Sequence, residues 1–326
     1  MKEVTTMKKI KMVLWVVILV VTLMACGKKE DGFAFVEEHV TIQSGEYELA
    51  GILTIPKSNQ AVPAILLVSG SGPNDMDSTT GKLKPFKDLA ESLAKQGIAT
   101  LRYHKVSYQH YLVVQKDVLF TLQDEYMDSV KGALDYLVAD RRIDSNNLYV
   151  LGHSQGGQMA PYLVNHDTRI KGSIIMAGTS MHLMDLIMEQ YLVYYGEQEY
   201  SDNLLYALTV KNIKENDPNK SEYFYFGAYY AYWLFYNQID FVSELLEAAN
   251  KPMLIMHGGK DLQINRSHFD TYQTLLKDTE GVSFSFYETL NHFFVDGVLE
   301  TIENAYQTEG KIPDDVIEEI VTFVLG

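Results

Sequence analysis

The sequence has a single cysteine, Cys26, in 326 residues. No disulfide can form within such a chain, so the fold must depend on its hydrophobic core. Positive charge is also scarce: 27 lysines and arginines stand against 43 aspartates and glutamates, for a net charge of −16. An acidic surface repels nucleic acid and anionic lipid headgroups. We therefore expect no nucleic-acid partner and no membrane attachment through a basic patch.

The amino-terminal segment has the layout of a secretory signal. Lys8, Lys9 and Lys11 precede an apolar run at 12–23, which is shorter than the roughly 20 residues needed to cross a bilayer. Residues 23–26 resemble a lipobox, the site at which bacterial lipoproteins are cleaved and lipidated. We expect residues 1–25 to be a lipoprotein signal peptide and Cys26 to carry the lipid. An uncleaved anchor and an ordinary signal peptide are the alternatives.

The expected anchor also predicts where the protein resides. Removing residues 1–25 takes away four lysines and one glutamate and lowers the net charge from −16 to −19, so membrane attachment would come from the lipid. Residues 26–35 form a polar tether. We expect an exported protein, anchored to the outer face of the bacterial cytoplasmic membrane or to the periplasmic side of an outer membrane.

Strand-like and helix-like segments alternate along residues 36–326, which is typical of an α/β fold with a mostly parallel central sheet flanked by helices. Residues 39–43 and 47–55 form an opening antiparallel pair. The later strands are predicted at 64–68, 98–103, 148–151, 173–177, 253–256 and 282–287. Helices are predicted at 85–96, 124–139, 155–165, 267–277 and 314–324, with Pro161 kinking the third or removing one hydrogen bond.

About 70 residues separate the strand predicted at 173–177 from the strand predicted at 253–256, far more than an ordinary connection requires. We assign 36–179 and 251–326 to the core and 180–250 to a helical lid inserted after the sixth strand. Ten aromatic residues fall within positions 223–236. They form either the core of a helical hairpin or a pocket for an apolar or aromatic acyl group, with Tyr229 and Trp233 among its walls.

A nucleophile is indicated by the GxSxG pattern at 152–156, which follows a predicted strand and precedes a predicted helix. Flanking glycines leave room for the strained turn that exposes the serine hydroxyl, so Ser154 is the candidate nucleophile. Gln155 opens the helix, where its backbone N–H can stabilise an oxyanion. The alternative is a glycine-rich turn with a capping serine.

A serine hydroxyl needs a histidine base and a carboxylate that orients the histidine. After this kind of turn the acid and then the histidine follow at the ends of later strands, which selects Asp261 and His292. His153 is expected to be a packed, hydrogen-bonded histidine. Weaker rivals for the acid or the base are His257, His268, Asp270 and Asp296.

The second oxyanion donor is expected in the glycine-rich loop at 69–73, because its glycines allow backbone N–H groups to converge. Ser71 N–H is our choice, with Gly70 as the fallback and as a further pocket residue. A simple chain reversal is the alternative for this loop.

Taken together, these residues resemble the α/β-hydrolase superfamily, and within it secreted bacterial esterase-like proteins related to dienelactone hydrolases, cinnamoyl esterases and serine aminopeptidase-like proteins. The similarity covers nearly all of 36–325 except the aromatic insertion. It implies an α/β-hydrolase fold with a Ser-His-Asp triad, carried by 69–75, 101–103, 152–161, 257–261 and 291–292. Two segments depart from the family pattern: Met76 stands where arginine is usual, and 104–107 replaces an Asp-x-Arg-Gly-like turn.

The leading hypothesis is a serine hydrolase that cleaves small-molecule carboxylic esters through an acyl-enzyme intermediate, without a metal or an organic cofactor. A peptidase or acyltransferase would use the same triad, so the sequence does not separate them. A non-catalytic surface lipoprotein that binds a lipid or a partner is the third possibility. The sequence indicates no oligomeric state.

Overall fold

The computed structural model describes residues 32–218, 220–297, 306–307 and 309–326. Cys26, the expected signal peptide and most of the expected tether lie outside these residues. Phe33–Gly326 is one compact unit, which contains both the predicted core and the predicted insertion. Within the described ranges, no helix combines the length and the apolar character needed to cross a membrane.

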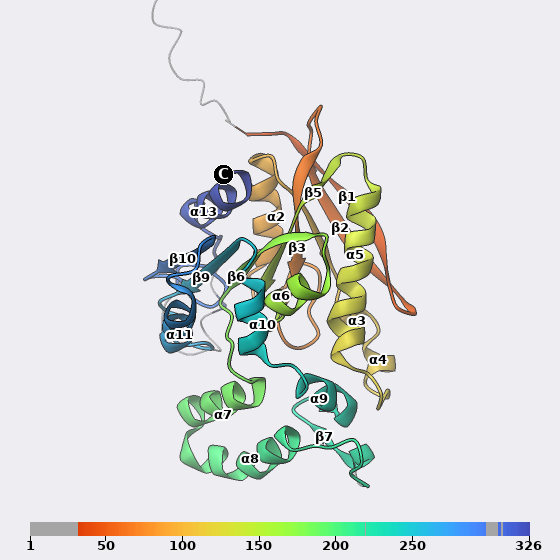
Figure 1. Ribbon diagram of the computed structural model, residues 1–326, viewed down its shortest axis with the longest axis vertical. Helices are drawn as coiled ribbons and strands as arrows, with labels where there is room; N and C mark the ends of the chain where they lie inside the picture. Colours follow the sequence, from red (N-terminus) through yellow and green to blue (C-terminus); the bar gives the residue numbers. More distant parts are fainter. Residues whose placement is uncertain (1–31, 219, 298–305, 308) are drawn as a thin grey trace, which may run out of the picture. The chain divides into compact units, whose positions relative to one another are not determined.

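The described residues contain an eight-stranded sheet in the order β1-β2-β4-β3-β5-β6-β9-β10 (Figure 1). Its strands are β1 (Phe35–Ser44), β2 (Tyr47–Pro56), β3 (Val62–Val68), β4 (Ala99–Tyr103), β5 (Ile143–His153), β6 (Ile170–Met176), β9 (Met253–Gly258) and β10 (Val282–Tyr287). β2 is antiparallel to both of its neighbours, and the other pairs are parallel. The predicted mostly parallel sheet is confirmed.

Strand β3 shows why this sheet is buried on both faces. Its residues are apolar without interruption, and successive side chains of a strand point to opposite faces. Leu66 and Val68 belong to one apolar cluster, and Ile65 and Leu67 belong to a second cluster on the other face.

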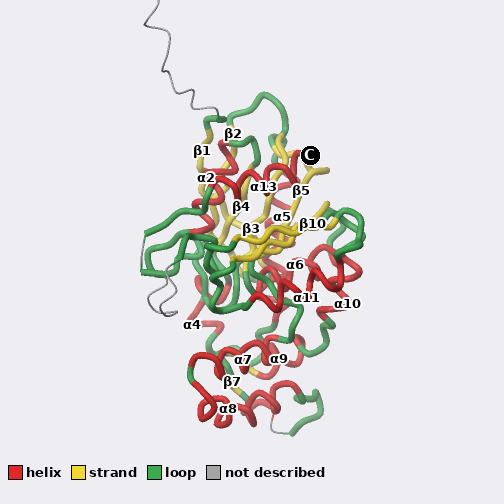
Figure 2. The backbone as a smooth tube through the Cα atoms, turned by 90° about the vertical axis from the view of Figure 1, so that its left-hand side faces the viewer, coloured by secondary structure: helices red, strands yellow, loops and turns green. Residues whose placement is uncertain are grey.

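Each face of the sheet is covered by its own set of helices. Figure 2 shows the strands of the sheet with helices around them. On one face the cluster is completed by α5 (Asp128–Ala139), α6 (Gln155–His166), α10 (Phe241–Ala248) and α11 (Arg266–Leu276). On the other face it is completed by α2 (Pro85–Lys95) and α13 (Asp314–Leu325). Pro161 lies inside α6 without ending the helix.

Between β6 and β9 the chain forms α7 (Leu183–Tyr194), α8 (Gly196–Lys211), the short η2 (Lys220–Glu222), and then β7 (Phe224–Tyr225), β8 (Ala228–Tyr229) and α9 (Tyr230–Tyr236) before α10. The helical-hairpin alternative for the aromatic run does not describe what forms, because the run begins as the antiparallel pair β7–β8 and only then continues as the single short helix α9. Phe226 and Gly227 both have positive φ, +51° and +81°, which suits a two-residue hairpin turn. Aromatic residues also favour strands over helices.

Candidate active site

Ser154 lies at the turn between β5 and α6, in a backbone conformation that few residues other than glycine adopt. Its φ is 57° and its ψ is −120°, and its N–H donates to the Met176 carbonyl at 2.9 Å. Strained conformations of this kind cost about 1–3 kcal/mol and persist only where the surrounding structure enforces them. The turn therefore has the geometry that the GxSxG pattern predicts.

The two outer glycines of the motif are required by close backbone contacts. A Cβ at Gly152 would lie 2.0 Å from the Gly156 carbonyl oxygen, and a Cβ at Gly156 would lie 2.2 Å from the Val68 carbonyl oxygen. Both distances are far shorter than any real Cβ contact. Helix α6 can therefore begin directly against β3 and β5 only because these positions lack side chains.

Asp261 and His292 meet at the carboxyl ends of β9 and β10. Asp261 Oδ2 and His292 Nδ1 are 2.7 Å apart, and both side chains are buried. The second oxygen, Oδ1, accepts from the backbone N–H groups of Gln263 and Ile264 at 2.8 and 2.9 Å. Because a carboxylate only accepts, Nδ1 carries the proton and Nε2 is left as the basic nitrogen of the ring.

The charge state of Asp261 follows from this environment. Burial by itself raises the pKa of the carboxyl, but the interactions with His292, with His257 and with the Ile264 N–H together outweigh burial and hold the pKa below the usual value. Asp261 is therefore ionised at neutral pH and can stabilise an imidazolium at His292.

His153 joins the turn of Ser154 to the loop of His292. Its Nε2 lies 2.8 Å from the His292 carbonyl oxygen, and the two imidazole rings have centroids 4.6 Å apart. Burial, followed by the nearby His292, lowers the pKa of His153 to about 3. His153 is therefore neutral, donates through Nε2–H and holds the two loops together, as the sequence predicts for a packed histidine.

The loop after β3 reaches the same place. A Cβ at Gly70 would lie 2.9 Å from Ser154 Cβ and 3.4 Å from Ser154 Oγ, so this loop packs directly against the serine. Ser71 lines a cavity together with Ser154 and Gln155, the first residue of α6. The first N–H groups of a helix have no acceptor within the helix, so the Gln155 N–H is available there.

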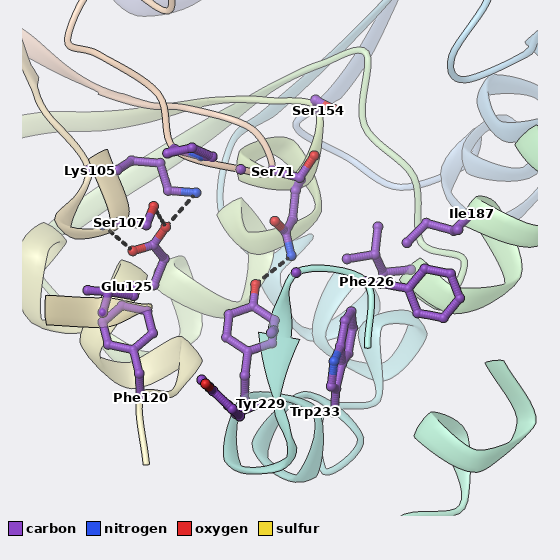
Figure 3. Close-up of a pocket in the computed structure, with 18 of the residues that line it drawn as sticks. Ser71, Lys105, Ser107, Phe120, Glu125, Ser154, Ile187, Phe226, Tyr229 and Trp233 are labelled. Atoms are coloured by element: carbon purple, nitrogen blue, oxygen red, sulfur yellow. Dashed lines mark hydrogen bonds and ion pairs between the residues drawn. The ribbon is translucent and has the colours of Figure 1, made fainter. Parts of the chain in front are cut away.

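The cavity has a volume of about 480 Å³ and extends from Ser154 toward the insertion (Figure 3). Tyr229 and Trp233 both line it, and the Trp233 indole is held by a 2.9 Å hydrogen bond to the Tyr225 carbonyl. Gly70 is not among the lining residues. The apolar walls are Val114, Phe120, Leu183, Leu186, Ile187, Phe224, Phe226, Ala228 and Ile264.

Two glutamines of α6 fasten the insertion beside the serine. Gln155 Nε2 donates to the Tyr232 hydroxyl at 3.0 Å, and the Tyr236 hydroxyl donates to Gln158 Oε1 at 2.6 Å. Both tyrosines belong to α9. The aromatic run therefore contributes to the cavity walls and to the packing of the insertion at the same time.

The rival candidates have other partners. His268 lies on α11 with Nδ1 2.8 Å from the Thr179 hydroxyl, and Asp296 accepts from the Thr289 hydroxyl at 2.7 Å. Asp270 pairs with Arg266 on the surface of α11. His257 is buried at the end of β9, and its ring stacks on aromatic neighbours.

Sequence reasoning missed a buried polar group beside the cavity, formed by Lys105, Ser107, Glu125 and Tyr126. The one available signal was the departure of 104–107 from the family pattern. That departure predicts altered loop contacts. It does not indicate that Lys105 pairs with Glu125, because the two residues are 20 positions apart in the sequence.

Comparison with known proteins finds a family and a relative that this sequence resembles. Residues 121–308, more than half of the chain, match the model of the prolyl oligopeptidase family. Esterase EstD of Thermotoga maritima is 30% identical over 302 residues, which make up 90% of this chain and 69% of EstD.

Solved structures share the fold. The acylaminoacyl peptidase of Pyrococcus horikoshii superposes with a TM-score of 0.54 at 17% identity over 84% of this chain, which spans only 39% of that peptidase. Dienelactone hydrolase from Anabaena variabilis superposes with a TM-score of 0.51 at 17% identity, over 89% of this chain and 97% of that one. The predicted α/β-hydrolase fold is confirmed.

Proposed function

Because this chain belongs to the prolyl oligopeptidase family and is a serine hydrolase, we propose that it cleaves carboxylic esters with Ser154 as nucleophile, His292 as base and Asp261 as the orienting carboxylate. The observation that carries the proposal is the 2.7 Å contact of Asp261 with His292, on a loop bonded to the strained turn of Ser154. The esterase name of the relative EstD favours an ester as the substrate.

The reaction begins when Ser154 Oγ attacks the ester carbonyl while His292 Nε2 takes the hydroxyl proton. The N–H groups of Ser71 and Gln155 donate to the oxyanion of the tetrahedral intermediate. The intermediate collapses by losing the alcohol, which receives the proton from His292. Water, activated by the same imidazole, then hydrolyses the acyl-enzyme and restores Ser154.

The cavity indicates the class of ester. Its walls are mainly apolar and aromatic, and a volume of about 480 Å³ holds more than an acetyl group. We assign it to the acyl part of the substrate, with residues 180–250 acting as its cover over the core formed by 36–179 and 251–326. Apolar and aromatic acyl esters are the expected substrates.

The decisive test labels the purified full chain with a fluorophosphonate and measures hydrolysis of nitrophenyl esters. We expect one adduct on Ser154, and loss of both the adduct and turnover in Ser154→Ala. Ser243→Ala, on the exposed start of α10, is the matched control and should behave as the wild type. Unchanged ester turnover in Ser154→Ala would refute the proposal.

A peptidase is the second candidate, favoured by the family description and using the same residues. Comparison of nitrophenyl esters with aminoacyl nitroanilides of the same acyl group separates the two activities. We expect the esters to be hydrolysed faster, because the cavity offers apolar walls for an acyl chain. Faster cleavage of the anilides would assign the site to peptides.

The location of the protein belongs to the same proposal. Cys26 carries a lipid that anchors the exported chain to a membrane, supported by the basic and apolar segments that precede it. Metabolic labelling with an alkyne fatty acid should mark the wild type and should fail to mark Cys26→Ser. Equal labelling of both chains would exclude lipidation at this residue.

A further inference from the structure

A buried lysine reaches the loop that carries Ser71. Lys105 is 3% exposed, and its Nζ donates to the Gly70 carbonyl at 2.8 Å and to the Tyr126 hydroxyl at 3.0 Å. It also lies 3.0 Å from Glu125 Oε1. An ammonium group has three N–H donors, and all three are engaged by these acceptors. Lys105 therefore has no donor left for a substrate, although its side chain lines the cavity.

Glu125 is also fully engaged. Its Oε1 accepts from the Ser107 hydroxyl at 2.5 Å as well as from Lys105, and its Oε2 accepts from the Ser107 N–H at 3.1 Å. The ion pair is thus buried and neutral overall. Taking two charges out of water is costly even when they pair, so stability alone does not account for this ion pair beside the cavity.

The Gly70 carbonyl oxygen accepts hydrogen bonds from several side chains. Besides Lys105, it accepts from the Tyr126 hydroxyl at 3.0 Å and from Asn74 Nδ2 at 3.1 Å. The Gly70 C=O and the Ser71 N–H belong to one planar peptide unit and point in opposite directions. Donors that hold the carbonyl therefore direct the Ser71 N–H away from Lys105. In the view of Figure 3, Ser71 lies between Lys105 and Ser154.

The same group reaches the second oxyanion donor. The Tyr126 hydroxyl lies 3.1 Å from Gln155 Oε1, and Gln155 Nε2 donates to the Tyr232 hydroxyl of the insertion. Burial, together with the nearby Glu125, raises the pKa of Tyr126 well above its usual value, so its hydroxyl stays protonated. The Gly70 carbonyl at 3.0 Å and Gln155 Oε1 at 3.1 Å therefore share the single hydroxyl proton of one buried tyrosine.

We propose that Lys105 is a positioning residue for ester hydrolysis, which holds and polarises the Gly70–Ser71 peptide so that the Ser71 N–H is aimed at the oxyanion before the substrate arrives. The inference rests on the proposed function. A cation at the carbonyl end draws electron density toward oxygen and strengthens the N–H as a donor. A donor fixed in advance needs no reorganisation when negative charge forms on the substrate.

The test uses the full chain with Lys105→Met/Glu125→Gln, because removing both charges avoids an unpaired carboxylate in the interior. Lys251→Met is the matched control: Lys251 Nζ also donates to two main-chain carbonyls, those of Val164 and Ile170, at the far end of α6. Tyr126→Phe is a second variant, which removes one donor to Gly70 while keeping the ion pair. It carries the test if the double variant does not fold.

Each chain is measured for kcat and KM on a nitrophenyl ester and for the inhibition constants of a trifluoromethyl ketone and of the product acid. The ketone forms a tetrahedral adduct with an oxyanion, whereas the acid binds as a ground-state ligand. We expect kcat/KM of the double variant to fall about 10- to 100-fold, with ketone binding weakened by the same factor. KM and product binding stay unchanged, Tyr126→Phe shows a smaller loss of the same kind, and Lys251→Met behaves as the wild type.

Unchanged kcat/KM in the folded double variant and in Tyr126→Phe would overturn the inference. Equal losses of ketone and product binding would also overturn it, since they indicate a general structural role. Failure of the proposed function has a different signature, because wild-type turnover would then persist in Ser154→Ala or be absent altogether.

Discussion

At the scale of single residues, the site depends on positions where side chains are excluded as much as on those that react. Ser154 keeps φ at 57° because α6 starts in direct contact with two strands. Gly156 makes that contact possible, since its Cα faces the carbonyl of Val68. The exposed hydroxyl is thus a consequence of backbone packing two residues away.

Gly156→Ala should therefore disable the enzyme. The new methyl group would meet the Val68 carbonyl oxygen at 2.2 Å and push α6 away from β3. We expect a loss of about 1–3 kcal/mol in the free energy of unfolding, the usual cost of overpacking, together with loss of ester turnover. Denaturant unfolding and nitrophenyl ester assays measure the two effects.

Gly196→Ala is the control for that substitution, because Gly196 has φ +87° but no atom within 4 Å of the added Cβ. It introduces backbone strain between α7 and α8 without a clash. Turnover should stay at the wild-type level. Equal loss of turnover in the two variants would contradict the packing argument.

The lowered pKa of His153 makes the stability of the fold depend on pH. Its folded pKa of about 3 lies below the usual 6.5, so the unfolded chain takes up a proton that the folded chain refuses. The contribution of neutral His153 is complete above pH 6.5 and is lost as the pH falls toward 3. Between pH 7 and 5 the unfolding free energy should drop by about 2 kcal/mol from this group. Asp261, whose pKa is lowered from 3.8, acts only at more acidic pH.

His153→Gln tests this assignment by denaturant unfolding at pH 7 and pH 5. The variant should lose the share of the pH dependence that His153 supplies, about 2 kcal/mol between pH 7 and 5. Burial also lowers the pKa values of His104, His182 and His257, so their shares stay. His39→Gln, at an exposed position on β1, should retain it. A wild-type slope in His153→Gln would show that another group is responsible.

At the scale of elements, α7 and α9 supply walls of the cavity beside the turn of Ser154. Gln155 and Gln158 project from successive turns of α6 and bond Tyr232 and Tyr236 of α9. α7 adds Leu183, Leu186 and Ile187 to the cavity lining. If the cavity holds the acyl group as proposed, the acyl preference should depend on side chains of the insertion, which does not include Ser154, Asp261 or His292.

Ile187→Trp should shorten the acyl chains that the enzyme accepts. Ile187 lines the cavity on α7, as Figure 3 shows, and a larger side chain there fills part of the space that we propose for the acyl group. We expect KM for an octanoyl ester to rise about tenfold, equivalent to the usual 1–3 kcal/mol of overpacking, with an acetyl ester unaffected. Kinetics over a series of acyl lengths give the measurement.

Leu192→Trp makes the same change in size on the same helix, at a side chain that is 45% exposed. Its acyl profile should match the wild type. If Ile187→Trp also keeps the wild-type profile, the cavity does not hold the acyl group.

At the scale of the whole molecule, charge influences which esters reach the site. The net charge of −16, or −19 once residues 1–25 are removed, creates a negative field around the chain, which repels anions during diffusion. Raising the ionic strength from about 0.01 M to about 0.15 M shortens the screening length from about 30 Å to about 8 Å.

An anionic ester such as a nitrophenyl hemisuccinate should gain from this screening. We expect its kcat/KM to rise several-fold between these salt concentrations, while that of the neutral nitrophenyl butyrate stays constant. Parallel assays of the two esters provide the comparison. A salt-independent hemisuccinate rate would show that the charge lies too far from the cavity entrance to matter.

Most strands and the turn of Ser154 could be predicted from the sequence, because each is encoded by a short stretch of residues. The periodicity of hydrophobic residues and the continuous apolar runs predicted the strands of the sheet, and the GxSxG pattern predicted the turn at Ser154. Strand ends of a parallel sheet gather at one edge, which is why chain order pointed to Asp261 and His292. Composition left two alternatives for the aromatic run, a helical core and a pocket wall. The positive φ values of Phe226 and Gly227 place a β-hairpin turn in its first half, and α9 forms only in its second half.

The sequence by itself determined the α/β class, the strained turn and the candidate reacting groups, because each depends on short-range sterics or on strand order. Only the tertiary structure decided what surrounds them. The 2.7 Å contact of Asp261 with His292, the cover from α7 and α9, and the approach of Lys105 to the Gly70 carbonyl join segments distant in the chain. Such contacts depend on how the layers pack, and no local pattern encodes packing.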